Sequence, residues 1–303
     1  MSTTVRRSPL RAYDQSVPPF RHLLVALPDP SINEGLLAYA AVLRAMFPGM
    51  EVRCIQVTQD SNSGNLQQVL TSTVVQSMPG VDCQVVTGDP LDEILEAAAD
   101  RKVDVILIAL NARDRRRSLA RRLAMKASCS VWIVPEKPQP PRWNILAPID
   151  FSRRAADTLE VATAIAEAAG TDTCLAPYVY FNHAAVTFDE FDDILAGDQF
   201  RAFGIFIAPI NLHGVFAKPL FIEALNVAQA IVRTAAEHEC DLIVMGTRGR
   251  STSAAVLLGS ETEQCIMTTE IPLLAVKHFG ASLPLMKALR DERLRRRADE
   301  RFT

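Results

Sequence analysis

The sequence predicts an α/β protein built from two tandem doubly wound domains, each a five-stranded parallel sheet with helices on both faces. Short, almost wholly apolar strands alternate with amphipathic helices along the chain, which is typical of a parallel sheet that is buried on both faces. The same order of elements then occurs a second time. A proline-rich segment separates the two copies and favours an extended linker.

The first copy begins with the apolar run HLLVAL at residues 22–27. Apolar residues at helical spacing follow between Leu36 and Leu43, and alternation with β-branched residues predicts a strand at 52–57. The remaining elements that we expect in this copy are strands at 81–86, 103–110 and 131–134 and helices at 91–100 and 119–127.

The second copy repeats these features. The run WNILAPI at 143–149 ends in Asp150-Phe151-Ser152, much as the first run ends near Asp29. The stretch at 230–245 corresponds to 93–109, and PLLAV at 272–276 corresponds to SVWIV at 130–134. The difference in residue number between corresponding positions of the two copies is larger near the end of the repeat than near its start. The second copy therefore carries an insertion. We place this insertion at residues 182–212, as an extended helix and loop.

These patterns divide the chain into five expected segments. They are a flexible arm at 1–20, a first domain at 21–135, a linker at 136–141, a second domain at 142–280 and a charged helix at 281–303.

Composition excludes several classes of protein. Hydrophobic residues are 49% and charged residues 22% of the chain, and the net charge of −3 predicts no general attraction to nucleic acid or to an anionic membrane. The first twenty residues lack the apolar run of a secretory signal, and no stretch is long and apolar enough to predict a membrane-spanning helix, so we expect a cytoplasmic protein. The six cysteines stand far apart without a CxxC pair, which favours buried free thiols over a zinc site or a disulfide framework.

Glycines after the predicted strand at 242–245 indicate a phosphate site. Ligands of doubly wound sheets bind beyond the carboxyl ends of the strands, and Gly246 and Gly249 let the backbone approach a phosphate closely. Gly259 and Ser260 open a predicted helix at 260–268, whose free amides favour an anion; Ser260 is also a candidate N-cap. Glycine spacing alone leaves a turn followed by a capped helix as an equal alternative.

The arrangement Gly246-x2-Gly249-x9-Gly259-Ser260, together with Asp150, resembles the ATP-binding motif of the universal stress protein family. The resemblance covers residues 20–135 and 142–278 and implies a Rossmann-like fold in both copies. It implies an adenine nucleotide as the ligand (ATP, or AMP or ADP), with Mg²⁺ accompanying a triphosphate. By position, Asp150, Pro148 and Val179 would contact the base, whereas the phosphate contacts would come from Gly246, Arg248, Gly249, Gly259, Ser260 and the Glu261 amide. For Asp150 the alternative is a cap on the helix that follows, a role that Ser152 also fits.

The first copy departs from this motif. It reads NARDRRRSLARRLAMKASCS after Leu110, without a glycine, so we predict that it keeps the fold and has lost the ligand, although Asp29 remains. The arginines of this stretch have two interpretations, a solvated loop and helix face or a patch for an anion or acidic partner. Nucleic acid is disfavoured because no aromatic residues are interleaved with them. The run comprises Arg113, Arg115, Arg116, Arg117, Arg121 and Arg122.

We therefore expect a nucleotide-dependent stress-response or signalling module with slow or no ATP hydrolysis, because no side chain is evidently placed as a general base. We assign no catalytic residue and no metal ligand; autophosphorylation on a loop hydroxyl is an additional hypothesis. One alternative is a structural adaptor or regulatory partner protein that binds no nucleotide. Another is an ATP-using adenylyl-transfer enzyme, although the HxGH and SGGxDS motifs are missing from the sequence.

The resemblance also implies an assembly. Members of the family pair through their last strand, and residues 131–134 and 273–276 are the candidate strands here. Pairing within one chain would cover two strand edges and form an intramolecular pseudo-dimer. A homodimer of the whole chain and an unidentified protein partner both remain open.

Overall fold

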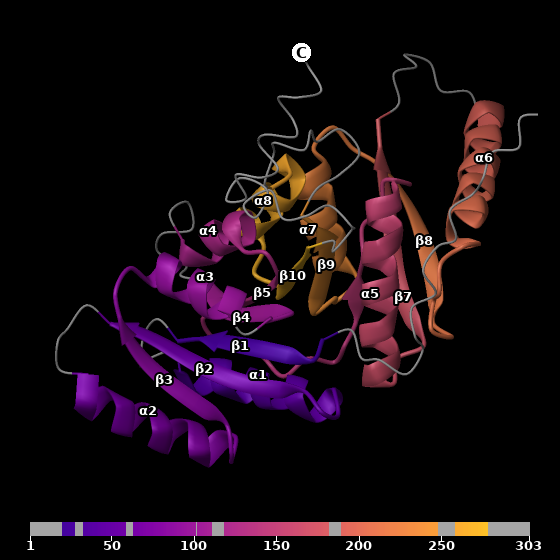
Figure 1. Cartoon of the computed structure of the whole chain (residues 1–303). Coiled ribbons are helices and arrows are strands. Elements are labelled where there is room, and N and C mark those ends of the chain that lie inside the picture. Colours follow the sequence, from indigo (N-terminus) through magenta and orange to yellow (C-terminus); the bar gives the residue numbers. More distant parts are fainter. Residues whose placement is uncertain are drawn as a thin grey trace, which may run out of the picture.

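The structure is a computed structural model of the 303-residue chain. It describes residues 20–27, 33–58, 63–100, 102–110, 118–181, 189–247 and 258–277, without the side chains at 33, 63–65 and 189–196. These residues form a ten-stranded sheet that helices cover on both faces (Figure 1).

The first half of the chain supplies five parallel strands in the spatial order β3-β2-β1-β4-β5. The strands are β1 (His22–Ala26), β2 (Glu51–Thr58), β3 (Asp82–Thr87), β4 (Val105–Leu110) and β5 (Ser130–Pro135). Its helices are α1 (Asn33–Met46), α2 (Ser63–Ser77), α3 (Pro90–Asp100) and α4 (Leu119–Lys126). Helices α1 and α2 lie on one face and α3 and α4 on the other, so the central strand β4 is buried at every position.

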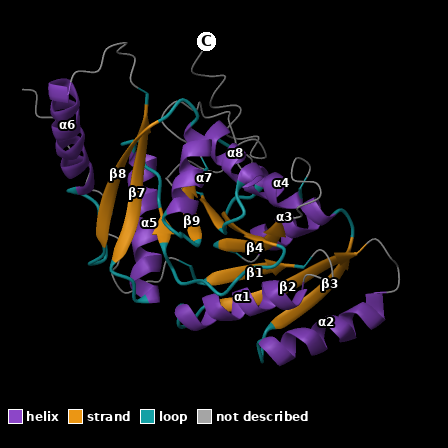
Figure 2. Cartoon of the chain, turned by 180° about the vertical axis from the view of Figure 1, so that it is seen from behind, coloured by secondary structure: helices purple, strands orange, loops and turns teal. Residues whose placement is uncertain are grey.

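The second half repeats this arrangement in the order β10-β9-β6-β7-β8. Its strands are β6 (Ile145–Leu146), β7 (Thr173–Tyr180), β8 (Phe216–Glu223), β9 (Leu242–Gly246) and β10 (Leu273–Val276), and its helices are α5 (Arg153–Ala169), α6 (Asp189–Ile207), α7 (Val227–Glu237) and α8 (Ser260–Thr268). Helix α5 covers one face and α7 and α8 the other, while α6 lies beside β8 at the outer end of the sheet (Figure 2). Both halves are therefore doubly wound, which confirms the predicted fold class.

The two halves meet through their last strands. Strand β10 pairs antiparallel with β5, with Leu273 opposite Ile133 and Leu274 opposite Trp132. These are the two strands expected to pair from the sequence, and their pairing joins the two parallel halves into one sheet. The α4 and α8 helices contact each other above this junction (Figures 1 and 2).

The repeat extends to the hydrogen bonds at the amino ends of the strands. In the first half, Asp104 Oδ2 accepts from the amides of Arg21 and His22, each at 2.8 Å, where β1 begins. In the second half, Asp241 Oδ2 accepts from the Arg142 amide just before β6. Burial raises the pKa of the Asp241 carboxyl above its usual value. The equivalent aspartates thus fix the first strand of each half.

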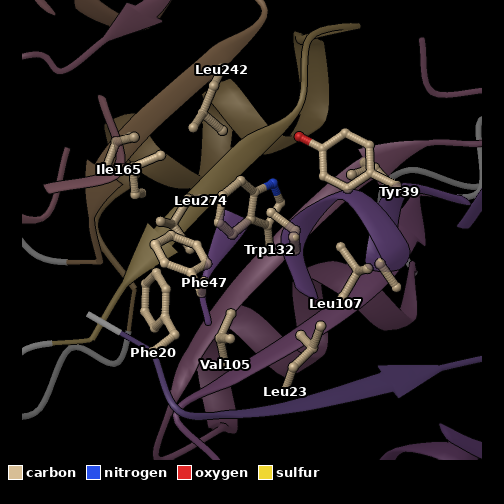
Figure 3. Packing of buried hydrophobic residues seen from close by; sticks show 14 of the residues in the cluster. Phe20, Leu23, Tyr39, Phe47, Val105, Leu107, Trp132, Ile165, Leu242 and Leu274 are labelled. Carbon is tan, nitrogen blue, oxygen red and sulfur yellow. The ribbon is translucent and has the colours of Figure 1, made fainter. Parts of the chain in front are cut away.

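Aromatic residues fill the core beside the junction. Trp132 of β5 is fully buried and makes an edge-on contact with Tyr39 at a ring centroid distance of 6.2 Å (Figure 3). It also contacts Trp143 of the second half edge-on, at a ring centroid distance of 6.4 Å. Phe20 packs edge-on against both Trp132 and Phe47 and is only 5% exposed. The expectation of a flexible arm over residues 1–20 was therefore wrong for Phe20, because its ring completes this core; the other residues of the arm lie outside the described residues.

Some boundaries differ from the predictions. The strand expected at 143–149 is short, because Trp143 has a φ of 66° and Pro148 lacks an amide hydrogen. Hydrogen bonds to β7 nevertheless continue beyond β6: the Ala147 amide donates to the Leu175 carbonyl at 2.8 Å, and Ile149 forms an isolated bridge with Tyr178. No element was assigned to residues 63–77, where α2 lies, because this stretch is rich in serine, threonine and glutamine. The insertion placed at 182–212 contains α6, whereas the charged helix expected at 281–303 lies outside the described residues.

Within the described ranges, no helix is long and apolar enough to cross a membrane.

Candidate functional site

The predicted site residues that the structure describes lie near the ends of three strands of the second half. Strand β6 lies between β9 and β7, and all three run parallel. Their carboxyl ends therefore share one edge of the sheet, where β9 leads toward α8 and β6 leads into α5. This edge is the place at which doubly wound sheets bind ligands.

Asp150 and Val179 lie next to each other on this edge. Ile149 bridges Tyr178, so the residues that follow them, Asp150 and Val179, are neighbours along the same pair of chains. Ile149 packs in the core on the α5 side, and strand alternation therefore directs Asp150 to the opposite face. Val179 packs against the core on that same face, which α7 and α8 cover. Pro148, two residues before Asp150, is half-buried.

Hydrogen bonds hold Asp150 in a tight turn at the start of α5. Its Oδ1 accepts from the Ser152 amide at 3.0 Å, and Ser152 Oγ accepts from the Ala155 amide at 3.1 Å as the N-cap of α5. Capping of α5 is thus done by Ser152, the residue that the sequence offered as the alternative to Asp150. The Asp150 carboxylate is held by this turn.

Gly246 and Gly259 lie at the two ends of the glycine-containing segment. Gly246 ends β9, and its carbonyl accepts from the buried Thr262 hydroxyl at 2.7 Å. The Gly259 amide donates to the Thr247 carbonyl at 2.7 Å, and the Thr247 amide donates to the Val276 carbonyl at 3.0 Å. These bonds attach the start of α8 to the end of β9. Arg248 and Gly249 lie in the segment between, outside the described residues.

The N-cap of α8 is Gly259, and the prediction that Ser260 also fits this role was wrong. Gly259 has extended backbone, with a φ of −72° and a ψ of 147°, and it makes no side-chain cap hydrogen bond. Ser260 is the first helical residue and is exposed, and its hydroxyl interacts with the Glu261 carboxylate at 3.3 Å. Because the N-cap is a glycine, no side chain at that position caps the first amides of α8, which lie at the edge of the sheet.

From the sequence, only the amide of Glu261 was expected to contribute to the site, but its side chain also makes a hydrogen bond. Its Oε2 accepts from the Ala228 amide at 3.1 Å, in the first turn of α7. A carboxylate at the N-terminus of a helix stabilises that helix, so Glu261 ties α8 to α7. This contact was not predictable, because Glu261 and Ala228 lie far apart in the sequence.

The corresponding helix of the first half is capped differently. Helix α4 also begins after the segment that follows a central strand, but its N-cap is Ser118, whose Oγ accepts from the Arg121 amide at 3.3 Å. Ser118 is 5% exposed, so the cap is buried. Its side chain occupies the position that Gly259 leaves open in the second half.

One arginine of the run, Arg121, makes a contact that neither interpretation foresaw. Arg121 of α4 donates from Nε to Glu263 Oε1 of α8 at 2.7 Å and forms an ion pair with it; the two side chains are 26% and 29% exposed. Arg122 is exposed on the same helix, whereas Arg113 to Arg117 lie outside the described residues. Arg121 therefore joins the two halves, and it does so one turn from the start of α8.

No metal site emerges from the described residues: they contain no group of three or more His, Cys, Asp or Glu side chains that could hold a metal ion. One cavity of about 510 Å³ lies at the junction of the halves, between Pro135 and the residues before β10. Neither Asp150 nor Gly259 lines it, so it is separate from the predicted nucleotide site.

Comparisons with known proteins agree with this architecture. Residues 206–277 match the model of the universal stress protein family. A solved structure of a functionally unknown protein from Pseudomonas aeruginosa PAO1 is 17% identical, with 87% of this chain and 93% of that chain covered and a TM-score of 0.63. A putative universal stress protein from P. aeruginosa UCBPP-PA14 is 19% identical, with 87% and 94% covered and a TM-score of 0.66.

A universal stress protein from Archaeoglobus fulgidus DSM 4304 is 18% identical, with 84% of this chain and 98% of that chain covered and a TM-score of 0.61. The TM-scores and the coverage of these three structures show a shared fold over both halves. No curated protein matches the sequence.

Proposed function

Because the chain carries a universal stress protein domain over residues 206–277, we propose that its second half binds one adenine nucleotide and that the protein acts as a nucleotide-dependent stress-response or signalling module. The observation that carries this proposal is the start of α8. Its N-cap, Gly259, has no side chain, and it lies at the shared strand edge together with Asp150 and Val179.

The chemistry of this edge suits a nucleotide with its phosphates at α8. Free amides in the first turn of a helix and the positive end of its dipole bind phosphate. Gly246 and Gly259 leave room for the phosphates to approach the backbone. Arg248 would add a positive charge, and Ser260 a hydroxyl donor. Mg²⁺ would accompany a triphosphate.

The base would lie over the ends of β6 and β7. Val179 offers an apolar contact and Pro148 a half-buried ring, while Asp150 offers a carboxylate that can accept from an exocyclic amine. This combination of one polar group with apolar walls is typical of small-molecule sites. It supports adenine over a purely anionic ligand such as inorganic phosphate.

Signalling would run through α8. A nucleotide changes the surface of a protein only if it binds one conformation more tightly than another. The Glu263–Arg121 pair links the first turns of α8 to α4 of the other half, so a phosphate held at Gly259 lies close to an inter-half contact. We therefore expect the nucleotide to act on partners through the α4–α8 surface.

Hydrolysis is expected to be slow. Glu261, the carboxylate nearest the start of α8, is engaged by the Ala228 amide and the Ser260 hydroxyl. A general base must reach the attacking water, which an engaged carboxylate does poorly. We expect turnover below about 1 s⁻¹, the lower end of typical enzymes.

Equilibrium binding of ATP, ADP and AMP to the full chain, measured by calorimetry, tests the proposal. Asp150→Ala is expected to weaken binding about tenfold, equivalent to about 1.4 kcal/mol, through loss of one hydrogen bond to the base. Asp29→Ala, at the equivalent position of the first half, is the matched control and should leave affinity unchanged. If wild-type protein binds none of the three nucleotides at millimolar concentration, the adaptor hypothesis replaces this one.

A further inference from the structure

Two of the six cysteines, far apart in the sequence, lie side by side in the sheet. Cys54 of β2 is the direct partner of Cys83 of β3 in the register of these parallel strands. We propose that Cys54 and Cys83 form a reversible disulfide when the protein meets a hydroperoxide, which makes the outer edge of the first half an oxidation site. This site is separate from the nucleotide site and does not depend on it.

The strand geometry brings the two thiols within reach of each other. Neighbouring strands lie about 4.8 Å apart, and disulfides join Cα atoms separated by about 4.4–6.8 Å. Residues in register on parallel strands point to the same face, and both cysteines contact the core that α1 and α2 cover. A disulfide brings the Cβ atoms to about 3.8 Å, so β3 must move toward β2 by about 1 Å.

Strand β3 is able to make this movement because it is the edge of the sheet. It pairs with β2 alone, and its outer side is held by the Gln67 side chain of α2. The Gln67 amide donates to the Cys83 carbonyl at 2.8 Å, and its oxygen accepts from the Val85 amide at 2.8 Å. Helix α2, which packs against β3, has to follow the shift together with Gln67, but no second strand has to move.

Cys83 is the thiol that an oxidant meets first. It is partly exposed, whereas Cys54 is only 2% exposed. The Cys83 thiol donates to the Val81 carbonyl at 3.5 Å. Interaction with the neighbouring Cys54 thiol lowers the pKa of Cys83, whereas interaction with Cys83 and burial raise the pKa of Cys54. A lowered pKa increases the fraction of thiolate, the form that reacts with peroxides.

The other four cysteines are expected to be unreactive toward peroxides. All four are buried, and burial raises the pKa of each thiol to about 12; they are Cys129, Cys174, Cys240 and Cys265. These thiols stay protonated at neutral pH. Reactivity is therefore expected to concentrate at the β2–β3 pair.

The reaction balances with one hydroperoxide. The Cys83 thiolate attacks a peroxide oxygen, the S–O bond forms as the O–O bond breaks, and the leaving oxygen takes a proton to give water when the oxidant is hydrogen peroxide. The sulfur of Cys54 then attacks the resulting sulfenic acid; the S–S bond forms, the S–O bond breaks, and the leaving hydroxide takes the Cys54 proton as a second water. Two thiols lose two electrons in total, and the peroxide gains them.

Treatment of the reduced full chain with hydrogen peroxide, followed by denaturing thiol titration and peptide mapping, tests the proposal. Loss of two of the six thiols, with one cross-linked peptide pair containing Cys54 and Cys83 and recovery on reduction, is the expected result. A map in which these two cysteines stay unlinked, or link to other cysteines, overturns the proposal. This result needs no variant.

Variants sharpen the order of events. Cys54→Ala should stop the reaction at the Cys83 sulfenic acid, which dimedone traps, whereas Cys240→Ser is the matched control and should retain the cross-link. Circular dichroism of each variant reports whether the fold survives. Trapping at Cys240 in place of Cys83 would contradict the assigned order.

Discussion

Helices α4 and α8 occupy equivalent places in the two halves, but their N-termini are completed in opposite ways. The first turn of α4 is capped by the buried Ser118 hydroxyl, so that helix satisfies its own amide. The first turn of α8 follows Gly259, which provides no side-chain cap. The fold therefore forms with either kind of cap on the helix that precedes the last strand. A phosphate ligand, in contrast, requires first-turn amides that no side chain has already capped. We propose that this one residue at the cap distinguishes the half that binds the nucleotide from the half that does not.

The largest effect is expected when a negative side chain is placed at the open cap. Gly259→Asp should weaken nucleotide binding by at least about 100-fold, equivalent to about 2.7 kcal/mol, because the carboxylate would occupy the position of a phosphate and repel it. Asp is at least as good an N-cap as Gly, so the melting temperature should not fall. Calorimetry and thermal unfolding of the same sample measure both properties.

The control for this variant is Ser118→Gly in the first half. It should leave nucleotide affinity unchanged, because we expect no ligand there. An unchanged affinity in a folded Gly259→Asp protein would show that α8 does not hold the phosphates.

The next effect concerns the contact that joins the two helices. Arg121→Met keeps most of the side chain's length but leaves Glu263 without its ion pair, which should lower the free energy of unfolding by about 1–2 kcal/mol. Arg122→Met, on the exposed side of the same helix, should change it by less than about 0.5 kcal/mol. Urea unfolding of both variants makes the comparison, and equal effects would mean that the ion pair contributes nothing to the junction.

A smaller difference is expected between two serines that look alike in the sequence. Ser118→Ala removes a buried cap and should destabilise the protein by about 1 kcal/mol. Ser260→Ala removes an exposed hydroxyl from the first helical position, where it caps nothing, and should cost only a few tenths of a kcal/mol. Urea unfolding measures the two values, and a larger loss for Ser260→Ala would contradict the assignment of Gly259 as the cap.

The two outer edges of the sheet extend the comparison. Gln67 covers the β3 edge through its side chain, whereas β8 has Pro219 at its centre. The Phe216 and Ala224 amides donate toward β7, so strand alternation places the Pro219 nitrogen on the outer side, where a missing amide hydrogen discourages pairing with another chain.

Pro219→Val restores this outward amide hydrogen, so two chains can pair through their β8 edges. The average molar mass of the particles in solution should therefore rise slightly at high protein concentration. Leu220→Val, whose amide faces β7, is the control. Sedimentation measures the change, and identical masses for the two variants would show that Pro219 does not protect the edge.

The fold was predictable because its signals are local. Apolar runs such as residues 105–110 mark buried strands, and their repetition in the second copy indicated the tandem order. Gly246 and Gly259 were singled out by their spacing and Asp150 by the resemblance to universal stress proteins, and all three lie near the carboxyl ends of β9 and β6. Contacts between distant segments were not predictable, because nothing in a single sequence pairs Arg121 with Glu263 or Cys54 with Cys83. The Ser118 cap was readable as a serine before a helix, but its significance appears only beside Gly259.

The number of adenine nucleotides bound per chain tests most directly whether only the second half holds a nucleotide. It is measured by native mass spectrometry of the full protein with ATP and by chromatography of any nucleotide released on denaturation. We expect one nucleotide per chain, lost in Gly259→Asp and retained in Ser118→Gly. Two nucleotides per chain would contradict the assignment of the first half as a structural copy, and none would remove the nucleotide site altogether.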